Sequence, residues 1–230
     1  MRRSPSRCLL KLSGEALKGP EGAFSPDALT RIAEEIAPLS LELAIVVGGG
    51  NVIRGAQSPW LGRVQADTLG MLATVLNALA LRSYLEVAGR IVLVQSAVHT
   101  ELTESIAPDK AKAALEQGSI VIFAGGTGSP LVTTDTAAAI RAVAIGADLL
   151  VKGSNVAGVY DKDPANSEDA TLLRDVSYDD YLERRYRVMD QIAVEICREH
   201  GLPIEVFSLA EPDALTRIAA GERVGTRIHA

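Results

Sequence analysis

Short apolar runs alternate along the chain with longer segments in which apolar residues recur at helical spacing. The short runs are rich in Val, Ile and Leu and predict strands at Cys8–Leu12, Leu43–Val47, Ile91–Val94, Ile120–Ala124, Leu149–Val151 and Ile204–Phe207. The periodic segments predict helices at Pro26–Leu39, Ala66–Val87, Pro108–Gln117, Thr134–Ile145, Val188–His200 and Asp213–Ala220. Because this alternation is typical of layered folds with parallel strands, we predict an α/β fold, a three-layer sandwich around a central, mostly parallel sheet.

Turn and capping residues agree with these boundaries. Ser25 and Pro26 supply an N-cap and a first helical residue for one helix. Four predicted helices are followed by a glycine, at Gly118, Gly146, Gly201 and Gly221. The segment 155–175 interrupts the alternation with turn residues and predicts a hairpin or an ordered loop. We therefore treat residues 1–230 as a single domain with a loose division near residue 146.

The predicted helix Ala66–Val87 is apolar on nearly all sides. Its central 14 residues, 68–81, carry no charge, which is too short a stretch to span a bilayer. A helix of this kind must be buried, and one copy of the chain has limited core to cover it. We predict that it packs against the same helix of a second copy. Complete burial within one copy is the alternative.

The composition is that of a soluble globular protein, with 47% hydrophobic and 23% charged residues. The net charge of −6 argues against a broad nucleic-acid surface but leaves room for a small basic pocket. Cys8 and Cys197 both lie in apolar patterns, so we expect reduced thiols in the core. No apolar segment of signal-peptide length follows the basic first residues. We therefore expect a cytoplasmic protein that binds neither nucleic acid nor membrane directly.

Two lysines occupy the same place in the pattern, at the carboxyl end of an apolar strand and before a turn of small residues. Lys11 lies in CLLKLSGEAL, residues 8–17, and Lys152 lies in LLVKGSNVAGVYDKDP, residues 149–164. A buried ammonium group needs a partner or a ligand, and a lysine beside free backbone N–H groups suits a phosphate. Two such lysines could hold opposite sides of a transferring phosphoryl group. The alternative for each is a side chain that bends outward into water.

Two glycine-rich loops also follow predicted strands. VVGGGNVIRG, residues 46–55, places three glycines after a strand and Arg54 within reach of a phosphate. FAGGTGSPLVTTDTAA, residues 123–138, opens into a helix start, where hydroxyl and N–H groups make an anion site. Asp135 in that stretch either caps the helix or orients a cationic catalytic group. Asp67 either caps the long helix or binds ligand hydroxyl groups, and the cap is the favoured interpretation.

Several familiar motifs are missing from the sequence. Gly14 and Gly19 have the spacing of a P-loop, but Pro20 and Glu21 stand where Lys and Ser or Thr are needed. The sequence contains no G-x-G-x-x-G and no G-x-S-x-G, and its three histidines lack the spacing of a metal site. The pattern therefore favours phosphate handling by glycine loops and lysines, outside the P-loop and Rossmann designs.

Five stretches, taken in order, resemble the bacterial uridylate kinases of the amino acid kinase family: KLSGEAL, GGGNVIRG, ADTLGMLATVLNALAL, GGTGSPLVTTDTAA and KGSNVAGVYDKDP. The likeness extends over almost the whole chain. It implies the amino acid kinase fold and transfer of the ATP γ-phosphoryl group to UMP, giving UDP for pyrimidine nucleotide biosynthesis, with Mg²⁺ accompanying ATP. It also implies a homohexamer, feedback inhibition by UTP, a UMP-binding and oligomerisation half at 1–146 and an ATP-binding half at 147–230.

The resemblance further implies a set of site residues. The catalytic residues would be Lys11, Arg54, Asp135 and Lys152. The ATP site would comprise Lys11, Leu12, Ser13, Gly14, Gly50, Arg54, Ser154, Asn155, Tyr160 and Asp163. The UMP site would comprise Gly49, Asp67, Thr127, Gly128, Ser129, Pro130, Leu131, Val132, Thr133 and Thr134. No residue is assigned to the metal, because Mg²⁺ seldom needs an all-protein cage.

Three positions depart from the common pattern of these relatives. Ala157 stands where Asp is frequent, Ser154 where Thr is common, and Ser119 precedes a strand where an arginine is frequent, which leaves activation by GTP open. One alternative is a kinase of the same fold acting on acetylglutamate, aspartate, glutamate or carbamate. Asp67 and the TGSPLVTT loop favour UMP over these substrates. A second alternative is a nucleotide-binding regulator without catalysis, against which both lysines and Asp135 argue.

Overall fold

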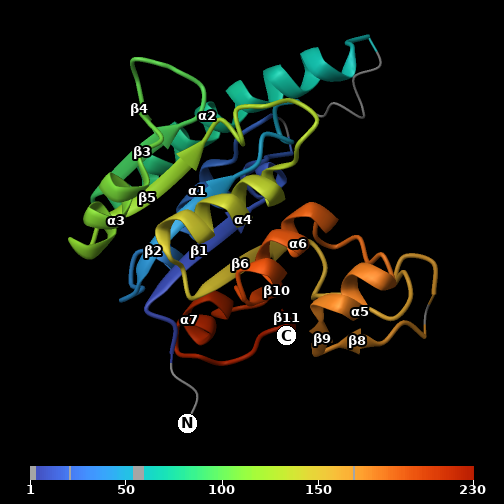
Figure 1. Ribbon diagram of the computed structural model, residues 1–230. Helices are drawn as coiled ribbons and strands as arrows, with labels where there is room; N and C mark the ends of the chain where they lie inside the picture. The colour runs from blue at the N-terminus through green and yellow to red at the C-terminus, as the bar shows by residue number, and fades with distance from the viewer. Residues whose placement is uncertain (1–3, 21, 54–59, 168) are drawn as a thin grey trace.

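The computed structural model describes residues 4–20, 22–53, 60–167 and 169–230. Its centre is a nine-stranded sheet in the order β4-β3-β5-β2-β1-β6-β10-β11-β9 (Figure 1). The strands of this sheet are β1 (Arg7–Leu12), β2 (Glu42–Val47), β3 (Val92–Ser96), β4 (Glu104–Ser105), β5 (Ile120–Ala124), β6 (Leu149–Ser154), β9 (Asp175–Ser177), β10 (Ile204–Ser208) and β11 (Thr226–His229). Neighbouring strands are parallel except for β10 and β11. The mostly parallel central sheet is therefore confirmed.

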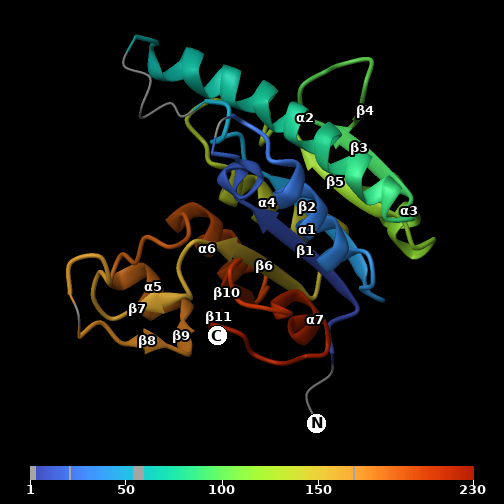
Figure 2. The same cartoon turned by 180° about the vertical axis from the view of Figure 1, so that it is seen from behind.

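Helices cover both faces of this sheet. They are α1 (Pro26–Ile36), α2 (Arg63–Val87), α3 (Pro108–Glu116), α4 (Thr134–Ile145), α5 (Tyr178–Glu183), α6 (Gln191–Glu199), α7 (Ala214–Ala219) and a 3-10 turn, η1 (Gly14–Leu17). One hydrophobic core joins the sheet to α1, α2 and α7, and a second core joins it to α3, α4, α5 and α6. Figure 1 shows α4 and α6 across the sheet, and the view from behind in Figure 2 shows α1 and α2. The predicted three-layer sandwich is confirmed.

The predicted strands and helices are all present, and most of their ends agree within a few residues. The helix start predicted at Val188 is wrong, because α6 begins at Gln191 with Asp190 as its N-cap. The long helix begins three residues earlier than predicted, at Arg63. The segment 155–175 contains the antiparallel pair β7 (Val159–Tyr160) and β8 (Leu172–Leu173), which confirms the predicted hairpin. The short strands β4, β9 and β11 have too few residues to leave a recognisable period.

The side chains of β1 alternate between the two cores. Leu10 and Leu12 join the core with α1 and α2, whereas Leu9 joins the core with α4. Because successive side chains of a strand point to opposite faces, Lys11 lies on the same face as Leu9, toward α4. Lys152 of β6 is paired with Lys11 in the parallel register, so the two lysines leave the same face side by side. The sheet itself therefore sets the spacing of the two cations.

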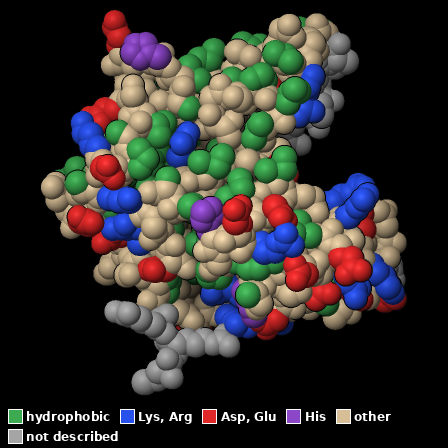
Figure 3. Space-filling model, in the orientation of Figure 1, with side chains coloured by type: hydrophobic (Ala, Val, Ile, Leu, Met, Phe, Trp, Pro, Cys, Tyr) green, Lys and Arg blue, Asp and Glu red, His purple; other side chains and the backbone are tan. Residues whose placement is uncertain are grey.

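The chain leaves part of α2 uncovered. Leu69, Leu72 and Leu76 are 41%, 44% and 52% exposed, and Trp60 before the helix is 75% exposed. Complete burial within one copy is therefore wrong. By length and composition α2 could cross a membrane, but core helices of soluble proteins pass the same test. Figure 3 shows hydrophobic side chains over the end of the molecule that carries α2, while charged side chains gather over the part with α5.

The two cysteines lie on opposite sides of the sheet. Cys8 belongs to the core with α1 and α2, and Cys197 to the core with α4 and α6. Both are buried free thiols, and burial raises the pKa of each to about 12. A thiol with so high a pKa carries almost no thiolate at neutral pH, so it is a poor nucleophile. The prediction of two core thiols is confirmed.

Candidate active site at the carboxyl ends of β1 and β6

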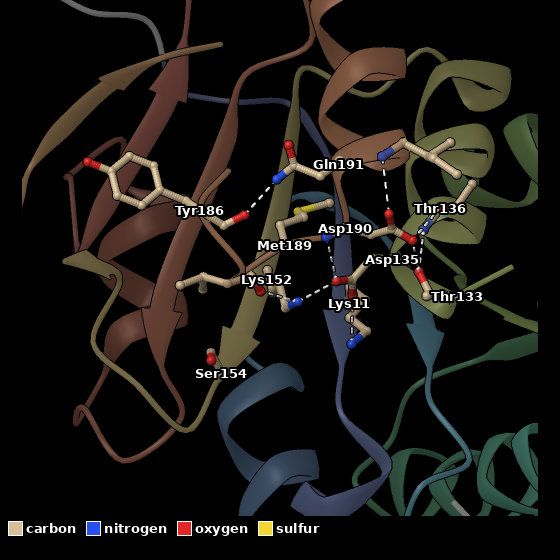
Figure 4. A network of polar contacts seen from close by, with 12 residues as sticks. Lys11, Thr133, Asp135, Thr136, Lys152, Ser154, Tyr186, Met189, Asp190 and Gln191 are labelled. Carbon is tan, nitrogen blue, oxygen red and sulfur yellow. Dashed lines mark hydrogen bonds and ion pairs between the residues drawn. The ribbon is translucent and has the colours of Figure 1, made fainter. Parts of the chain in front are cut away.

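A buried carboxylate lies between the two lysines that the sequence singles out (Figure 4). Asp135 lies in the first turn of α4, with its Oδ1 2.8 Å from Nζ of Lys11, while its Oδ2 accepts a hydrogen bond from Nζ of Lys152. All three residues are no more than 8% exposed. The lysines therefore do not bend outward into water. Asp135 does not cap α4 either, because Thr133 does.

The charges of this cluster reinforce one another. Burial opposes ionisation of Asp135, but the charges and hydrogen bonds of Lys11 and Lys152 outweigh it and lower the pKa of Asp135 to about 2. Burial lowers the pKa of Lys152, an effect that the negative charge of Asp135 opposes. Two ammonium groups and one carboxylate leave one net positive charge. At the carboxyl edge of a parallel sheet, such a cluster suits a phosphate group.

The loop after β2 packs closely on the turn after β1 and on α2. A Cβ atom on Gly14 would lie 2.6 Å from the carbonyl oxygen of Gly48. One on Gly49 would lie 2.5 Å from the carbonyl oxygen of Gly70 in α2. A side chain at either position would have to displace backbone, so glycine is required at both. The first glycine-rich loop is thus held between β1 and α2.

A buried pair of asparagines fixes this loop to α2. The side-chain amides of Asn51 and Asn77 donate to each other's oxygens, at 2.9 and 2.6 Å. Asn77 also donates to the carbonyl oxygen of Gly48 at 2.6 Å, and Asn51 donates to that of Ala23 at 2.7 Å. Removing either side chain would leave its partner with unsatisfied polar atoms in the interior. The pair therefore makes the loop's position depend on α2.

The loop between β5 and α4 encloses a small cavity against α2. The amide of Gly125 donates to Oγ1 of Thr74 at 2.7 Å, and the amide of Leu131 donates to Oδ2 of Asp67 at 2.9 Å. The cavity has a volume of about 130 Å³ and is lined by Gly49, Gly50, Ile53, Ala66, Asp67, Gly70, Met71, Thr74, Gly126, Ser129, Val132 and Thr134. Both glycine-rich loops and α2 therefore meet at one cavity, next to Asp135.

Asp67 is not a helix cap, contrary to the favoured interpretation. It lies one turn inside α2, where the Nε of Arg63 donates to both of its oxygens at 3.0 and 2.9 Å. The helix begins earlier than predicted because its N-cap is Gly62, which has no side chain to cap the helix and so leaves no start signal in the sequence. With the cap excluded, the second interpretation, a carboxylate that accepts hydrogen bonds from ligand hydroxyl groups, stays a prediction.

The residues expected to contact UMP divide into two groups. Those that line the cavity are Gly49, Asp67, Ser129, Val132 and Thr134. Those of the same loop that do not line it are Thr127, Gly128, Pro130, Leu131 and Thr133. The hydroxyl of Thr133 is turned toward α6, where it donates to Oδ2 of Asp190 at 2.6 Å. The Thr133 hydroxyl is therefore bound to Asp190 and does not line the cavity.

The residues expected at the ATP site surround the ends of β1 and β6. Ser154 is the last residue of β6, close to Lys152 in Figure 4, and Asn155 follows it. Ser13 caps η1 by accepting a hydrogen bond from the amide of Glu15. Leu12 lies in the core, so only its backbone could face a ligand.

The rest of the expected ATP site lies in the hairpin segment and beyond the described residues. Tyr160 is half-buried in β7. The carboxylate of Asp163 accepts hydrogen bonds from the amide of Ala165 and the side chain of Asn166, both in its own loop. Arg54, expected among the catalytic and ATP-binding residues, lies outside the described residues. The roles of these three residues stay predictions.

Asp190 lies beside the site without having been predicted there. Its carboxylate accepts hydrogen bonds from Thr133, the N-cap of α4, and from Thr136 of α4, and its amide donates to Asp135 at 3.3 Å. An aspartate directly before an apolar periodic segment is a recognisable N-cap signal. That signal predicts the start of α6, but no local pattern predicts contacts with a helix more than 50 residues away.

Comparison with known proteins agrees with this geometry. The chain matches the amino acid kinase family over residues 6–208. It is 45% identical to a uridylate kinase of Magnetococcus marinus, with 96% of this chain and 95% of the relative covered. It is 44% identical to a uridylate kinase of Methylococcus capsulatus, with the same coverage.

Solved structures give the same answer in three dimensions. A UMP kinase from Bacillus anthracis superposes with a TM-score of 0.94 at 37% identity, covering 99% of this chain and 97% of that one. A UMP kinase from Ureaplasma parvum superposes with a TM-score of 0.92 at 32% identity over the full length of both chains. Sequence, fold and relatives agree along nearly the whole length: this chain belongs to the amino acid kinase family.

Proposed function

We propose that this protein is a UMP kinase, which transfers the γ-phosphoryl group of ATP to UMP and forms UDP and ADP in pyrimidine nucleotide biosynthesis. The relatives named uridylate kinase and UMP kinase support this choice of substrate. The observation that carries the proposal is the buried cluster of Lys11, Asp135 and Lys152. It lies one residue from Thr134, which lines the cavity between the two glycine-rich loops.

The reaction follows from the charges of the cluster. A phosphate oxygen of UMP forms a bond to the γ-phosphorus of ATP, while the bond from that phosphorus to the β–γ bridging oxygen breaks. The electron pair of the broken bond stays on ADP. Because two anions must approach, the protein chiefly aligns them and neutralises charge. Lys11 and Lys152 supply positive charge beside the transferring group, and Asp135 holds both ammonium groups in place.

The two nucleotides are assigned to the two sides of this cluster. UMP is proposed to lie in the cavity beside α2, with the carboxylate of Asp67 accepting hydrogen bonds from ribose hydroxyl groups. Its phosphate would face Gly49 and Thr134, where N–H groups at the start of α4 favour an anion. ATP is proposed to lie across β1 and β6, contacting the turn after Lys11, Gly50, Arg54, the residues after Lys152, Tyr160 and Asp163.

Mg²⁺ is proposed to enter with ATP. Across the described residues, no three or more His, Cys, Asp or Glu side chains are grouped to hold a metal ion. Both oxygens of Asp135 are occupied by the two lysines. This donor set fits a metal held by nucleotide phosphates and water. Such a metal, when bound, would neutralise phosphate charge that the lysines leave uncompensated.

The uncovered face of α2 supports assembly with other copies of the chain. Together with the loop after β2 it borders a second cavity of about 600 Å³, whose apolar lining includes Trp60, Leu69, Leu72 and Leu76. A large, contiguous apolar surface that is exposed to solvent usually marks a site where another molecule binds. We propose that α2 packs against α2 of a second copy and that the assembly is a homohexamer.

Regulation and location complete the proposal. UTP contains the same uridine as UMP, so it is proposed to occupy the uridine site and inhibit the enzyme as the end of the pathway accumulates. The protein is proposed to act in the cytoplasm, where ATP and UMP are present. The acidic net charge of −6 gives direct binding to nucleic acid no support.

A coupled assay of ADP formation tests the proposed function. The purified chain receives ATP and Mg²⁺ with UMP, CMP, AMP or GMP in parallel, and with acetylglutamate, aspartate, glutamate or carbamate in a second panel. We expect UMP to support turnover and the carboxylates and carbamate to support none. Turnover with a carboxylate or carbamate alone would assign a different reaction of the same fold. ATP binding without turnover of any acceptor would contradict catalysis and support a regulator.

A further inference from the structure

Three consecutive residues before α6, Val188, Met189 and Asp190, lie beside the lysine cluster, and two of them bond to it (Figure 4). The carbonyl oxygen of Val188 accepts a hydrogen bond from Nζ of Lys152 at 2.6 Å. Both backbone polar groups of Met189 bond to the hydroxyl of buried Tyr181, its N–H donating at 2.6 Å and its C=O accepting at 2.8 Å. The third residue, Asp190, reaches across to α4. A segment outside both glycine-rich loops is thereby built into the site.

Asp190 binds α4 on both sides of the residue that organises the lysines. Its Oδ2 accepts hydrogen bonds from the hydroxyl groups of Thr133 at 2.6 Å and Thr136 at 3.1 Å. Its own amide donates to Oδ2 of Asp135 at 3.3 Å. Its other oxygen, Oδ1, accepts the amide of Ile192 and caps α6. One side chain thus locks the first turn of α4 to the first turn of α6.

We propose that Asp190 is a positioning residue for phosphoryl transfer, which fixes Asp135 and through it both lysines by clamping the start of α4 to the start of α6. This inference rests on the proposed kinase function. A purely structural cap would need only Oδ1 and the amide of Ile192. Capping α6 does not explain why Oδ2 of Asp190 accepts hydrogen bonds from Thr133 and Thr136 at the start of α4.

The charge of Asp190 adds a second, separable effect. The charged groups facing Lys152 are Lys11 from β1, Asp135 from α4 and Asp190 before α6. Burial and the charge of Lys11 lower the pKa of Lys152, whereas Asp135 and Asp190 oppose that shift. Removing the Asp190 carboxylate would therefore lower the pKa of Lys152 further. Because Lys152 acts as a cation, the basic limb of the pH profile of kcat should move to lower pH.

The test is Asp190→Ser, assayed with ATP, Mg²⁺ and UMP. Serine is a favoured N-cap, so α6 keeps its cap, but the shorter hydroxyl cannot hold both threonines of α4. We expect kcat to fall on the order of 10–100-fold, because a small displacement of catalytic groups costs that much. We expect KM for ATP to change little and the basic limb of kcat to move to lower pH. Wild-type kcat together with an unmoved basic limb would overturn the proposal.

Two further variants separate positioning from stability. Ser177→Ala removes the N-cap of α5 in the same layer, where the Ser177 hydroxyl bonds to Asp180, and should lower the Tm while leaving kcat and the basic limb unchanged. Thr136→Val removes one of the two hydroxyl groups that Asp190 binds. As a single variant it should lower kcat. In the double variant with Asp190→Ser, it should cause little further loss of kcat. If Asp190→Ser does not fold, an unchanged kcat in Thr136→Val overturns the proposal.

A readout without turnover distinguishes this inference from the proposed function. If the wild-type chain does not phosphorylate UMP, the proposed function fails by itself. Competitive acetylation of Lys152 with acetic anhydride across pH, followed by mass spectrometry, reports the pKa of Lys152 in either case. A lower pKa in Asp190→Ser than in the wild-type chain supports the role of Asp190. An equal pKa contradicts it.

Discussion

At the scale of single residues, the proposed chemistry rests on three side chains, Lys11, Asp135 and Lys152, that form ion pairs with one another. Lys11 and Lys152 could be singled out because each breaks an apolar strand at the same place, before a turn of small residues. Asp135 could be singled out only with two open roles. The structure decides between them, because Asp135 of α4 forms ion pairs with Lys11 of β1 and Lys152 of β6. No local sequence pattern predicts contacts between these three elements. Asp190 shows the same limit, since its contacts with Thr133, Asp135 and Thr136 join residues more than 50 positions apart.

Lys11→Ala should lower kcat by about 10²–10³-fold, as expected when one group that stabilises developing charge is removed from a buried site. The fold should survive, because Asp135 remains paired with Lys152 in the interior. Steady-state kinetics and a thermal unfolding scan measure both effects. Lys162→Ala is the matched control, since Lys162 is an exposed lysine whose partner is Asp169. Near-normal turnover in Lys11→Ala would remove Lys11 from the mechanism.

Asp135→Asn should destabilise the protein by about 3–5 kcal/mol at neutral pH, because it leaves two buried ammonium groups without their counterion. The folded-state pKa of Asp135 is about 2, below its ordinary 3.8. Its contribution is therefore fully present above about pH 4 and is lost as the pH falls through about 2. Urea unfolding across this range should show the stability gap between wild type and variant shrinking. A gap that stays constant with pH would contradict the assignment.

At the scale of elements, the strongly periodic segments were predictable and the short ones were not. The strand Ile120–Ala124 and the helix Thr134–Ile145 agree with their predicted bounds because apolar period and end signals coincide there. The short strands β4, β9 and β11 have two to four residues, too few for a period. The start of α2 also differs from the prediction, since its N-cap, Gly62, makes no side-chain hydrogen bond that the sequence could signal. Tertiary packing decides such ends.

Gly49→Ala tests how tightly the first glycine-rich loop is held against α2. An added Cβ would lie 2.5 Å from the carbonyl oxygen of Gly70, so the loop or the helix must move. We expect a loss of about 1–3 kcal/mol in stability and a rise in KM for UMP of about 10-fold or more. Gly22→Ala is the control, because nothing lies within 4 Å of its added Cβ. Equal behaviour of the two variants would show that the contact is unimportant.

At the scale of the whole molecule, the alternation of strands and helices in the sequence was enough to predict the sandwich. The sequence could not predict which side of α2 would stay exposed. A helix that is apolar on nearly all sides predicts burial without saying what provides it. The structure assigns one side of α2 to the core and leaves Leu69, Leu72 and Leu76 partly exposed. The division of the chain near residue 146 stays a prediction.

Leu76→Glu should weaken the proposed assembly, since a charge would then stand on the apolar face of α2 beside the 600 Å³ cavity. Sedimentation velocity at micromolar concentration should show large assemblies for the wild-type chain and smaller species for the variant. Val87→Glu is the control, because Val87 is 90% exposed at the far end of α2 and outside that cavity. A wild-type chain that sediments as a single 24.3 kDa species would contradict assembly.

The pairing of β1 with β6 has a consequence for motion. Lys11 and Lys152 stand opposite each other on adjacent hydrogen-bonded strands, and neighbouring strands keep a separation of about 4.8 Å. The two lysines cannot move apart without breaking the hydrogen bonds between β1 and β6. The ammonium groups of Lys11 and Lys152 therefore move together as one rigid unit. Any closure around bound nucleotides would have to come from the loops at the carboxyl edge of the sheet.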